Sequence, residues 1–426
     1  MKIARYVFYL LLALAPLGTR YIMRTGEIAG VPVEPGTVSV FATQALVVVF
    51  VIAALLAVKG RVRLSMSVVT GAVLALFAGA SVLWAVDTDY AAVTGGYVVL
   101  GSLLMMGVVA VKPEPGKAAA ALTIGATAQA IFGLRQFFTQ EVVGSTVLGV
   151  APHTAADLGA FVVETPAGRW LRAYGTLPHP NMYGTYLAVG LLATIILFMI
   201  ARSHRVRMLL TASIAVMGAG LLVSFSRSAF LALLVGSVVL LVFSDVRTLF
   251  ARRFAAGLII VMSAALVMGA IYPDVVTPRI SGEGRLEEVS TGERLSQLDE
   301  AQMLFLAHPI VGVGMGQMPI SLFFEQWDGR AGFYYQPVHI VPVLVVVELG
   351  LIGIFLWVLF IRGIIVRVWK QRLELRDSAF FVGFIALLTV SLVDHFVWSL
   401  WFGQVLFWIM VGMTLSALTS RENVLK

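Results

Sequence analysis

The sequence predicts an all-α, polytopic integral membrane protein. The chain has 426 residues, of which 59% are hydrophobic and only 12% are charged. Its mean hydropathy of +0.94 lies well outside the range of ordinary soluble domains. Stretches without a formal charge recur along the whole chain, and most can cross a hydrocarbon core of about 30 Å, which takes about 20 helical residues. No soluble domain or internal repeat is evident, so residues 1–426 are expected to form one integral membrane domain.

We expect about twelve transmembrane helices. Two are predicted around Ala4 to Leu17 and around Pro337 to Ile361. The first resembles a signal peptide, but a retained anchor would return both chain ends to one side of the membrane. The other ten coincide with the charge-free runs, which are residues 35–58, 64–86, 90–111, 118–134, 173–201, 208–226, 228–244, 254–273, 378–393 and 396–420.

Basic residues divide unequally among the predicted loops. If the N-terminus is cytoplasmic, the cytoplasmic segments hold 20 of the 30 basic residues, including every lysine, and only five acidic residues. This pattern follows the positive-inside rule, so the net charge of +7 is a signal of topology and not of nucleic-acid binding. Both termini are therefore expected in the cytoplasm, with residues 138–180 and 273–336 as the long loops outside.

The second of these loops, 273–336, is expected to contain a short amphipathic helix. Its helical pattern runs from Glu293 to about Leu306 and stops before His308-Pro309. Such a helix suits the membrane surface or the outside of the bundle. The glycine-rich stretch GVGMGQ, residues 312–317, follows it. No Lys-Ser or Lys-Thr pair comes after these glycines, so we predict a tight turn and not a phosphate-binding loop.

Arg227 lies in SFSRSAF, residues 224–230, between two charge-free runs. A guanidinium at membrane depth costs about 2.5–3.5 kcal/mol on insertion scales, so such a residue usually pairs or serves a site. The two flanking runs are short, which holds the tip of this predicted hairpin near the interface. A bidentate cation there suits a lipid-linked phosphate or pyrophosphate. An arginine that snorkels to the headgroups is the structural alternative.

Arg294 is expected at the start of the helix in the 273–336 loop. An arginine at a helix N-terminus is electrostatically unfavourable unless something negative compensates it. Either Glu293 and its neighbours do so, or a bound anion does. Arg279 and Arg285 lie nearby and are equally basic, so position alone does not choose among the three arginines.

His339 is a candidate general base. It follows the aromatic, polar stretch FYYQP, which makes Tyr334, Tyr335 and Gln336 candidate substrate contacts. Pro337 fits the first turn of the next membrane helix and would place His339 about one turn inside it. An imidazole there can accept a proton from a sugar hydroxyl at neutral pH, and a histidine bonded to a neighbouring helix is equally compatible. Glu348 lies roughly 13 Å deeper along the helix axis and is interpreted as a packing or relay carboxylate.

Two further polar groups stand at predicted helix ends. Arg172, His179 and Asn181 lie in RAYGTLPHPNMYG, residues 172–184, where Asn181 is expected to cap a helix or to contact substrate. Asp87-Thr88-Asp89 has the DxD pattern with which many glycosyltransferases hold a divalent ion. Asp89 is equally suited to cap the helix before Tyr90, and this reading is preferred, so no metal site is expected.

Four stretches, in this order, resemble the O-antigen ligase and polymerase superfamily: RAYGTLPHPN, SFSRSAF, ERLSQLDEAQMLFLAHPIVGVGMGQ and HIVPVLVVVELGLIG. The similarity covers about residues 170–360, and the first 170 residues match only in topology. The ligase signature is His, then Asn, Ser or Gln, nine residues, Gly-x-x-Gly, and then Thr or Val. His339, Gly350 and Gly353 have this spacing, whereas Ile340 and Ile354 depart from it at the two variable positions.

The resemblance implies a GT-C-like membrane architecture and an inverting, metal-independent glycosyl transfer at the periplasmic face of a Gram-negative inner membrane. The implied donor is a glycan on undecaprenyl pyrophosphate, and the implied acceptor is a sugar hydroxyl of the lipid A-core oligosaccharide. The essential arginines and histidine of the family correspond best to Arg227, Arg294 and His339. No cofactor and no nucleic acid is expected, and membrane lipids are the remaining partners.

Three other functions remain open at this point. An O-antigen polymerase would use the same donor twice, and an O-linked protein glycosyltransferase is usually a longer chain. A twelve-helix transporter is the alternative outside enzymes. Transporters usually show a pseudo-repeat and ionisable residues near the membrane midplane, whereas the polar residues here gather at the predicted outer face.

Overall fold

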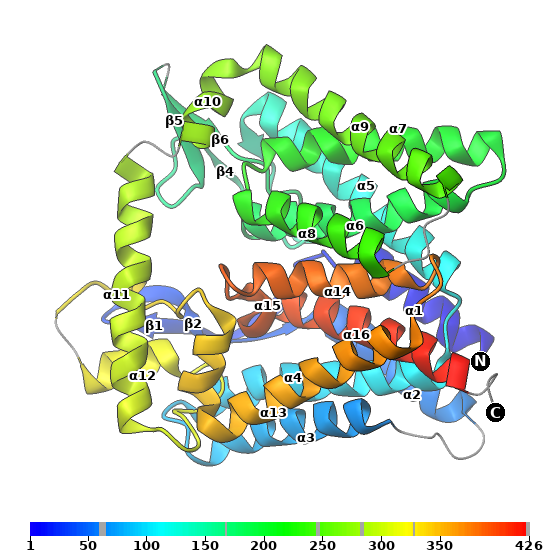
Figure 1. The fold of residues 1–426 in the computed structure, drawn as a ribbon. Coiled ribbons are helices and arrows are strands. Elements are labelled where there is room, and N and C mark those ends of the chain that lie inside the picture. The colour runs from blue at the N-terminus through cyan, green and yellow to red at the C-terminus, as the bar shows by residue number, and fades with distance from the viewer. Residues whose placement is uncertain (59–64, 167, 244–247, 282–284, 327–328, 423–426) are drawn as a thin grey trace.

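The computed structural model describes residues 1–426 except 59–64, 167, 244–247, 282–284, 327–328 and 423–426 (Figure 1). At residues 248, 278–281, 285–291 and 421–422 it describes the backbone alone. Helices account for most of this part of the chain, and they pack side by side around one continuous apolar core.

The apolar bundle is built from α1 (Lys2–Leu14), α2 (Ala42–Ala57), α3 (Met66–Ala80), α4 (Thr88–Val111), α5 (Pro115–Thr139), α6 (Pro180–Ile200), α7 (His204–Val223), α8 (Arg227–Phe243), α9 (Thr248–Ile271), α13 (Val341–Gln371), α14 (Ser378–Val390) and α16 (Trp401–Glu422). Among the described residues, 8 helices are long and apolar enough to cross a membrane. Three more, α2, α8 and α14, are apolar but shorter. The predicted fold class, an all-α polytopic membrane protein, is confirmed, while the count of twelve spans stays a prediction.

Three two-stranded hairpins, which the sequence analysis missed, lie outside this bundle. They pair β1 (Arg20–Ile28) with β2 (Val31–Phe41), β3 (Glu141–Val142) with β4 (His153–Thr154), and β5 (Val162–Thr165) with β6 (Gly168–Leu171). The charge-free run 35–58 therefore begins in β2, because VPVEPGTVSVF alternates valines with prolines and a glycine and suits a strand. The membrane helix α2 starts only at Ala42.

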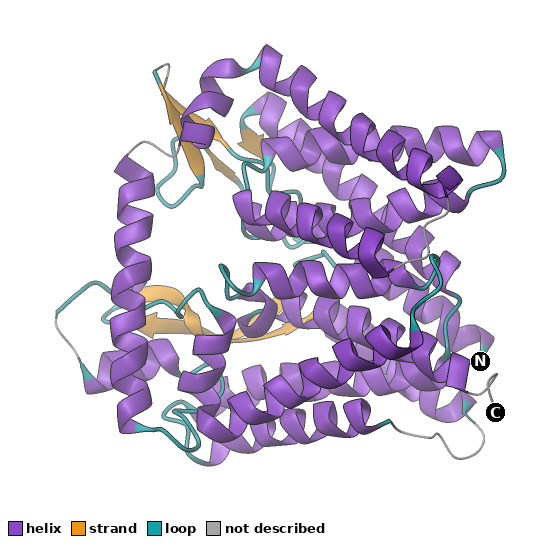
Figure 2. Cartoon of the chain, viewed as in Figure 1, coloured by secondary structure: helices purple, strands orange, loops and turns teal. Residues whose placement is uncertain are grey.

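The hairpins gather at one end of the bundle, which we call the hairpin end (Figure 2). The helices between residues 273 and 336 lie at the same end: α10 (Pro273–Ser281), α11 (Arg285–Ala307) and α12 (Met318–Glu325). The long helix α11 crosses the other helices at a steep angle (Figure 1). The chain begins and ends at the opposite end, which we call the terminal end.

The start of α11 differs from the prediction. The helix begins at Arg285 and not near Glu293, so Arg294 lies in its interior. No proline interrupts residues 285–293, and Gly292 costs only about 1 kcal/mol in a helix interior, so nothing ends the helix before Ala307. The argument that Arg294 sits at a helix N-terminus is therefore wrong. The predicted stop before His308-Pro309 is confirmed.

Arginines of the terminal end hold the ends of neighbouring helices. Arg5 donates to the carbonyl of Val111, the last residue of α4, at 3.3 Å. Arg253 reaches Met199 near the end of α6 at 2.7 Å, and Arg372 reaches the carbonyl of Val242 in α8 at 3.1 Å. The last carbonyls of a helix have no partner within it and carry partial negative charge. Some of the basic residues that predicted the topology thus also cap the C-terminal ends of neighbouring helices.

A break within α13 sets the position of its first half. Gly350 has φ 65° and ψ −163°, a conformation essentially restricted to glycine. The glycine-rich segment 309–316 lies against this break. Val313 donates to the carbonyl of Val347 at 3.0 Å, and Leu351 donates to that of Pro309 at 2.9 Å. These bonds replace the helical ones that the break removes.

The segment 312–317 forms the predicted turn. Gly312, Gly314 and Gly316 all have positive φ, with values of 69°, 106° and 75°. Its N–H groups already have partners: Gly314 donates to the carbonyl of Glu348, Met315 donates to the Ser81 hydroxyl, and Gly316 donates to the Glu348 carboxylate. With these donors committed, the loop has no array of amides for a phosphate, as the sequence analysis predicted.

Gly350→Ala is expected to destabilise the folded protein strongly. A Cβ at this position would lie 2.2 Å from the carbonyl oxygen of Ile310, and the backbone conformation alone costs a non-glycine residue about 1–3 kcal/mol. The measurement is the midpoint of thermal unfolding of the purified protein in detergent.

The matched control is Gly269→Ala in α9, where a Cβ meets nothing within 4 Å. That variant should unfold near the wild-type temperature. Equal stability of the two variants would show that the break in α13 is not held as described.

Candidate active site

Two predicted site residues, His179 and Asn181, lie at the start of α6. The sequence analysis expected Asn181 to cap this helix, but the cap is His179, whose Nδ1 accepts from the backbone N–H of Asn181 at 2.9 Å. The reason is Pro180, which lacks an N–H and fits the first helical position, so the helix begins there. The amide side chain of Asn181 is left for other contacts.

Asn181 uses that side chain to join an arginine to a carboxylate. Its Oδ1 accepts from Arg172 Nη2 at 3.0 Å, and its Nδ2 donates to Asp394 Oδ2 at 3.1 Å. Arg172 is only 6% exposed. Its Nε also donates to the carbonyl of Ser224 at 2.9 Å. The structure thus gives Arg172 a bracing position between α6 and the turn before α8, and its predicted contact with substrate stays a prediction.

Arg227 lies directly beyond this braced turn. It is the first residue of α8 and is exposed at the joint with α7, which ends at Val223. Phe225 within the turn has φ 49°, a left-handed conformation that costs a bulky residue. A second contact of Arg172, at 3.5 Å to the carbonyl of Phe225, helps to hold it. The prediction that Arg227 stands at the tip of a helical hairpin is confirmed.

The prediction that His339 lies one turn inside a helix is wrong. His339 lies two residues before the start of α13 at Val341. The proline of the first turn is Pro342 and not Pro337, which leaves residues 335–340 as an irregular segment before the helix. The imidazole of His339 packs against that of His395, with ring centroids 5.2 Å apart. Its Nδ1 lies 2.8 Å from Oε1 of Gln297 on α11.

Four titratable residues form what we call the histidine cluster: His179, His339, Asp394 and His395. Asp394 and His395 precede α15 (Phe396–Ser399), and Nδ1 of His395 lies 2.6 Å from the Ser399 hydroxyl. Asp394 is only 7% exposed. The chain thus gathers the starts of α6, α13 and α15 around one buried carboxylate.

Burial controls the charge state of this cluster. It lowers the pKa of His339 to about 4, where the nearby His395 and Arg294 also lower it and Asp394 opposes them. Burial lowers the pKa of His179 to about 3. Burial opposes ionisation of Asp394, but the three histidines and the Asn181 amide outweigh it and lower the pKa of the carboxyl. His339 is therefore neutral near pH 7 and can accept a proton.

The other predicted residues are distributed as follows. Arg294 is exposed on α11, and its positive charge contributes to the lowered pKa of His339. The side chains of Arg279 and Arg285 lie outside the described residues. Three more residues precede His339 in the chain: Tyr334 is exposed, Gln336 donates to the carbonyl of Phe333 at 2.9 Å, and Tyr335 is fully buried.

The burial of Tyr335 argues against the predicted contact with substrate. Its ring lies beneath the Arg330 guanidinium, 5.0 Å from the ring centroid, and packs against Phe323 with centroids 5.6 Å apart. The buried ring of Tyr335 therefore anchors the segment that precedes His339.

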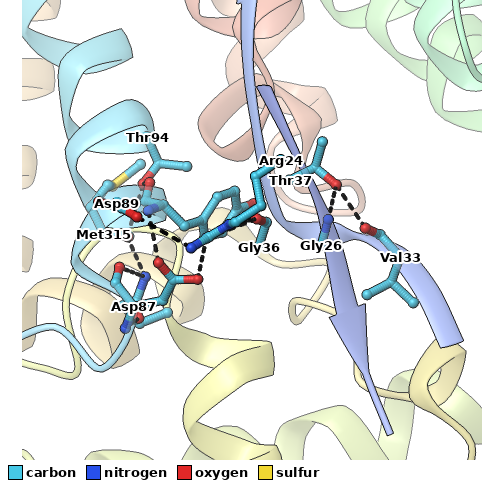
Figure 3. A network of polar contacts seen from close by, with 11 residues as sticks. Arg24, Gly26, Val33, Gly36, Thr37, Asp87, Asp89, Thr94 and Met315 are labelled. Atoms are coloured by element: carbon cyan, nitrogen blue, oxygen red, sulfur yellow. Dashed lines mark hydrogen bonds and ion pairs between the residues drawn. The ribbon is translucent and has the colours of Figure 1, made fainter. Parts of the chain in front are cut away.

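The Asp87-Thr88-Asp89 motif (DTD motif) has a structural role. Asp87 caps α4 by accepting from the backbone N–H of Tyr90 at 3.0 Å, so the cap is Asp87 and not Asp89 (Figure 3). Both carboxylates also face Arg24 of β1, which forms an ion pair with Asp87 and lies 3.4 Å from Asp89. Within the described ranges, no group of three or more His, Cys, Asp or Glu side chains is arranged to hold a metal ion.

Sequence reasoning missed Asp394, His395 and Gln297. The first two had a usable signal: they separate the charge-free runs 378–393 and 396–420, as Arg227 separates its own two runs. Gln297 had none, because a glutamine on an amphipathic helix is ordinary and its importance comes from a partner 42 residues away.

Comparison with known protein families identifies one segment of the chain. Residues 212–358 match the family model described as O-antigen ligase. No curated protein matches the chain. The matched segment includes Arg227, Arg294 and His339, while Arg172, Asn181 and Asp394 lie outside it. By this match residues 212–358, about a third of the chain, are similar to the O-antigen ligase family.

Proposed function

We propose that this protein is an O-antigen ligase that transfers a glycan from undecaprenyl pyrophosphate to a sugar hydroxyl of lipid A-core oligosaccharide. The observation that carries the proposal is the placement of His339. This neutral base lies within electrostatic range of Arg294 and of the buried Asp394, at one end of an apolar helical bundle, within a segment that matches the O-antigen ligase family.

The chemistry needs a base and a group that stabilises the leaving group. His339 takes the proton of the acceptor hydroxyl as its oxygen attacks the anomeric carbon of the donor sugar. The new C–O bond forms on the face opposite the bond to pyrophosphate, which breaks, so the configuration inverts. The electron pair of the broken bond leaves with the pyrophosphate, whose growing charge Arg227 and Arg294 would stabilise.

Asp394 supports the charged form of His339 that arises during the transfer. Its charge raises the pKa of His339 against the effect of burial, so an ionised Asp394 favours the imidazolium once the proton has moved. Asn181 holds the carboxylate in place at 3.1 Å. The pyrophosphate donor is already activated, so the step requires neither nucleotide nor metal ion.

We also propose the side of the membrane on which this happens. Among the described residues, the connections of α4 with α5, of α6 with α7 and of α13 with α14, all predicted to be cytoplasmic, lie at the terminal end of the bundle (Figure 1). The starts of α6, α13 and α15, next to which the histidine cluster lies in the chain, face the hairpin end, where α11 also lies. The positive-inside rule then puts the hairpin end on the periplasmic side of an inner membrane. A lipid-linked donor and a lipid-anchored acceptor both reach that interface by lateral diffusion.

Variants at Arg227 and His339 should separate the two chemical roles. Arg227→Ala is expected to lower kcat/KM about 10²–10³-fold, the usual loss for one group that stabilises transition-state charge. Arg227→Lys should still lose roughly tenfold, because it keeps the charge but not the two-pronged geometry. His339→Ala should bind donor normally and lose about 10²–10⁴-fold in transfer. The assay is a reconstitution of purified protein with undecaprenyl-pyrophosphate glycan and lipid A-core, with EDTA present.

Arg135→Lys, an exposed arginine near the end of α5, is the matched control and should behave as wild type. Membrane abundance and donor binding are measured beside transfer for every variant. Full activity of His339→Ala would refute the mechanism. Elongated lipid-linked glycan in place of modified lipid A-core would identify a polymerase. A strict requirement for Mg²⁺ or Mn²⁺ would instead support metal binding by the Asp87-Thr88-Asp89 motif.

The proposed orientation predicts which surface positions react with a membrane-impermeant thiol reagent. The chain contains no cysteine, so single substitutions report cleanly. Leu158→Cys, at a side chain that is 100% exposed at the hairpin end, should label in intact spheroplasts. Ser203→Cys, exposed before α7 at the terminal end, should label only after permeabilisation. The reverse pattern would place the histidine cluster in the cytoplasm.

A further inference from the structure

The bond between Gln297 and His339 restricts where the imidazole carries its proton. Oε1 of Gln297 lies 2.8 Å from Nδ1 of His339, and an amide oxygen can only accept a hydrogen bond. Nδ1 must therefore donate. A neutral imidazole has a single N–H, so Nε2 is left with a lone pair.

The Gln297 amide is held in a fixed place. The residue is 4% exposed, and Ala301 and Leu304 anchor the same helix in the core. Two polar contacts tie α11 down further along: Glu300 Oε1 to Arg330 Nη1 at 2.6 Å, and His308 Nε2 to Glu325 Oε1 at 3.0 Å. A buried amide on an anchored helix cannot turn away without losing its bond, and so it imposes one tautomer on its partner.

The neutrality of the amide also matters. A carboxylate at this position would fix the same tautomer, but it would raise the pKa of His339 and put negative charge beside the proposed pyrophosphate site. The groups that already face His339 are His395 and Asp394 after α14, His179 at the start of α6, and Arg294 on α11. Gln297 adds a hydrogen-bond acceptor to this set without adding charge.

We infer that Gln297 is a positioning residue that keeps the proton of His339 on Nδ1 and presents Nε2 as the base to the acceptor hydroxyl. This inference rests on the proposed function for its catalytic meaning. Arg294 lies one helical turn before Gln297 on α11. The packing of α11 against the bundle therefore determines two things at once: the position of the Arg294 guanidinium and the tautomer of His339.

The direct test is ¹⁵N NMR of the full-length protein with ¹⁵N-labelled histidine. The chain has 6 histidines, so the signal of His339 is identified by its loss in His339→Asn. The wild type should show a protonated Nδ1 and an unprotonated Nε2. In Gln297→Leu, which has a similar volume and no acceptor, a large fraction of His339 should move its proton to Nε2. Gln302→Leu, at an exposed position on the same helix, is the control and should leave the tautomer unchanged.

Kinetics supply the second arm. Gln297→Leu should lower kcat about 10–100-fold, within the range that a positioned base contributes, and leave donor binding intact. Gln297→Glu retains an acceptor for Nδ1–H, which covers the case in which the leucine variant fails to fold. Its added carboxylate should raise the pKa of His339, so the acidic limb of the kcat/KM profile should move to higher pH by about one unit or more.

A wild-type His339 protonated on Nε2, or an unchanged tautomer in Gln297→Leu, would overturn the inference. An unmoved acidic limb in Gln297→Glu would do the same. The NMR arm requires no turnover, so it separates the inference from the proposed function. The expected tautomers in a protein that transfers no glycan would support the positioning of His339 by Gln297 and refute the ligase proposal alone.

Discussion

The site depends on one side-chain amide. Asn181 accepts from Arg172 and donates to Asp394, at 3.0 and 3.1 Å, and so joins segments that are more than 200 residues apart in sequence. Through Arg172 it also reaches the turn that presents Arg227. A buried guanidinium and a buried carboxylate are each costly without a partner. The amide satisfies both while keeping the carboxylate near the histidines.

The rest of the site follows from how α13 is broken. The residues around Gly350 exchange helical hydrogen bonds for bonds to the glycine-rich segment, and Glu348 accepts from the indole of Trp398 on α15 at 2.8 Å. Trp398 lies three residues after His395. One buried carboxylate therefore ties the helix that follows His339 to the short helix that follows His395. Buried charges in a membrane protein usually mark a functional site, and here Arg172, Glu348 and Asp394 each have a structural partner.

Much of this arrangement was accessible from the sequence, and the reasons for the failures are physical. Charge-free runs located the apolar helices because hydrocarbon tolerates few charges over about 20 residues. The same signal located Arg227, and applied consistently it would have found Asp394 and His395. The β1–β2 hairpin was lost because its valines extend the apolar run of α2, and hydropathy does not distinguish strand from helix. The start of α11 was misplaced because the helical pattern was followed only from Glu293, although a single glycine such as Gly292 is tolerated in a helix interior. The bond of Gln297 to His339 is long-range and has no local pattern.

The central claim is that the hairpin end holds a lipid-linked pyrophosphate between two arginines, with His339 free to take a proton from the acceptor. The most direct measurement is an experimental structure of the protein in lipid nanodiscs with undecaprenyl pyrophosphate bound. The account predicts phosphate oxygens within hydrogen-bond distance of Arg227 and Arg294, with Nε2 of His339 facing the reacting end of the donor. A pyrophosphate bound at the Arg24–Asp87 network or among the basic residues of the terminal end would contradict it.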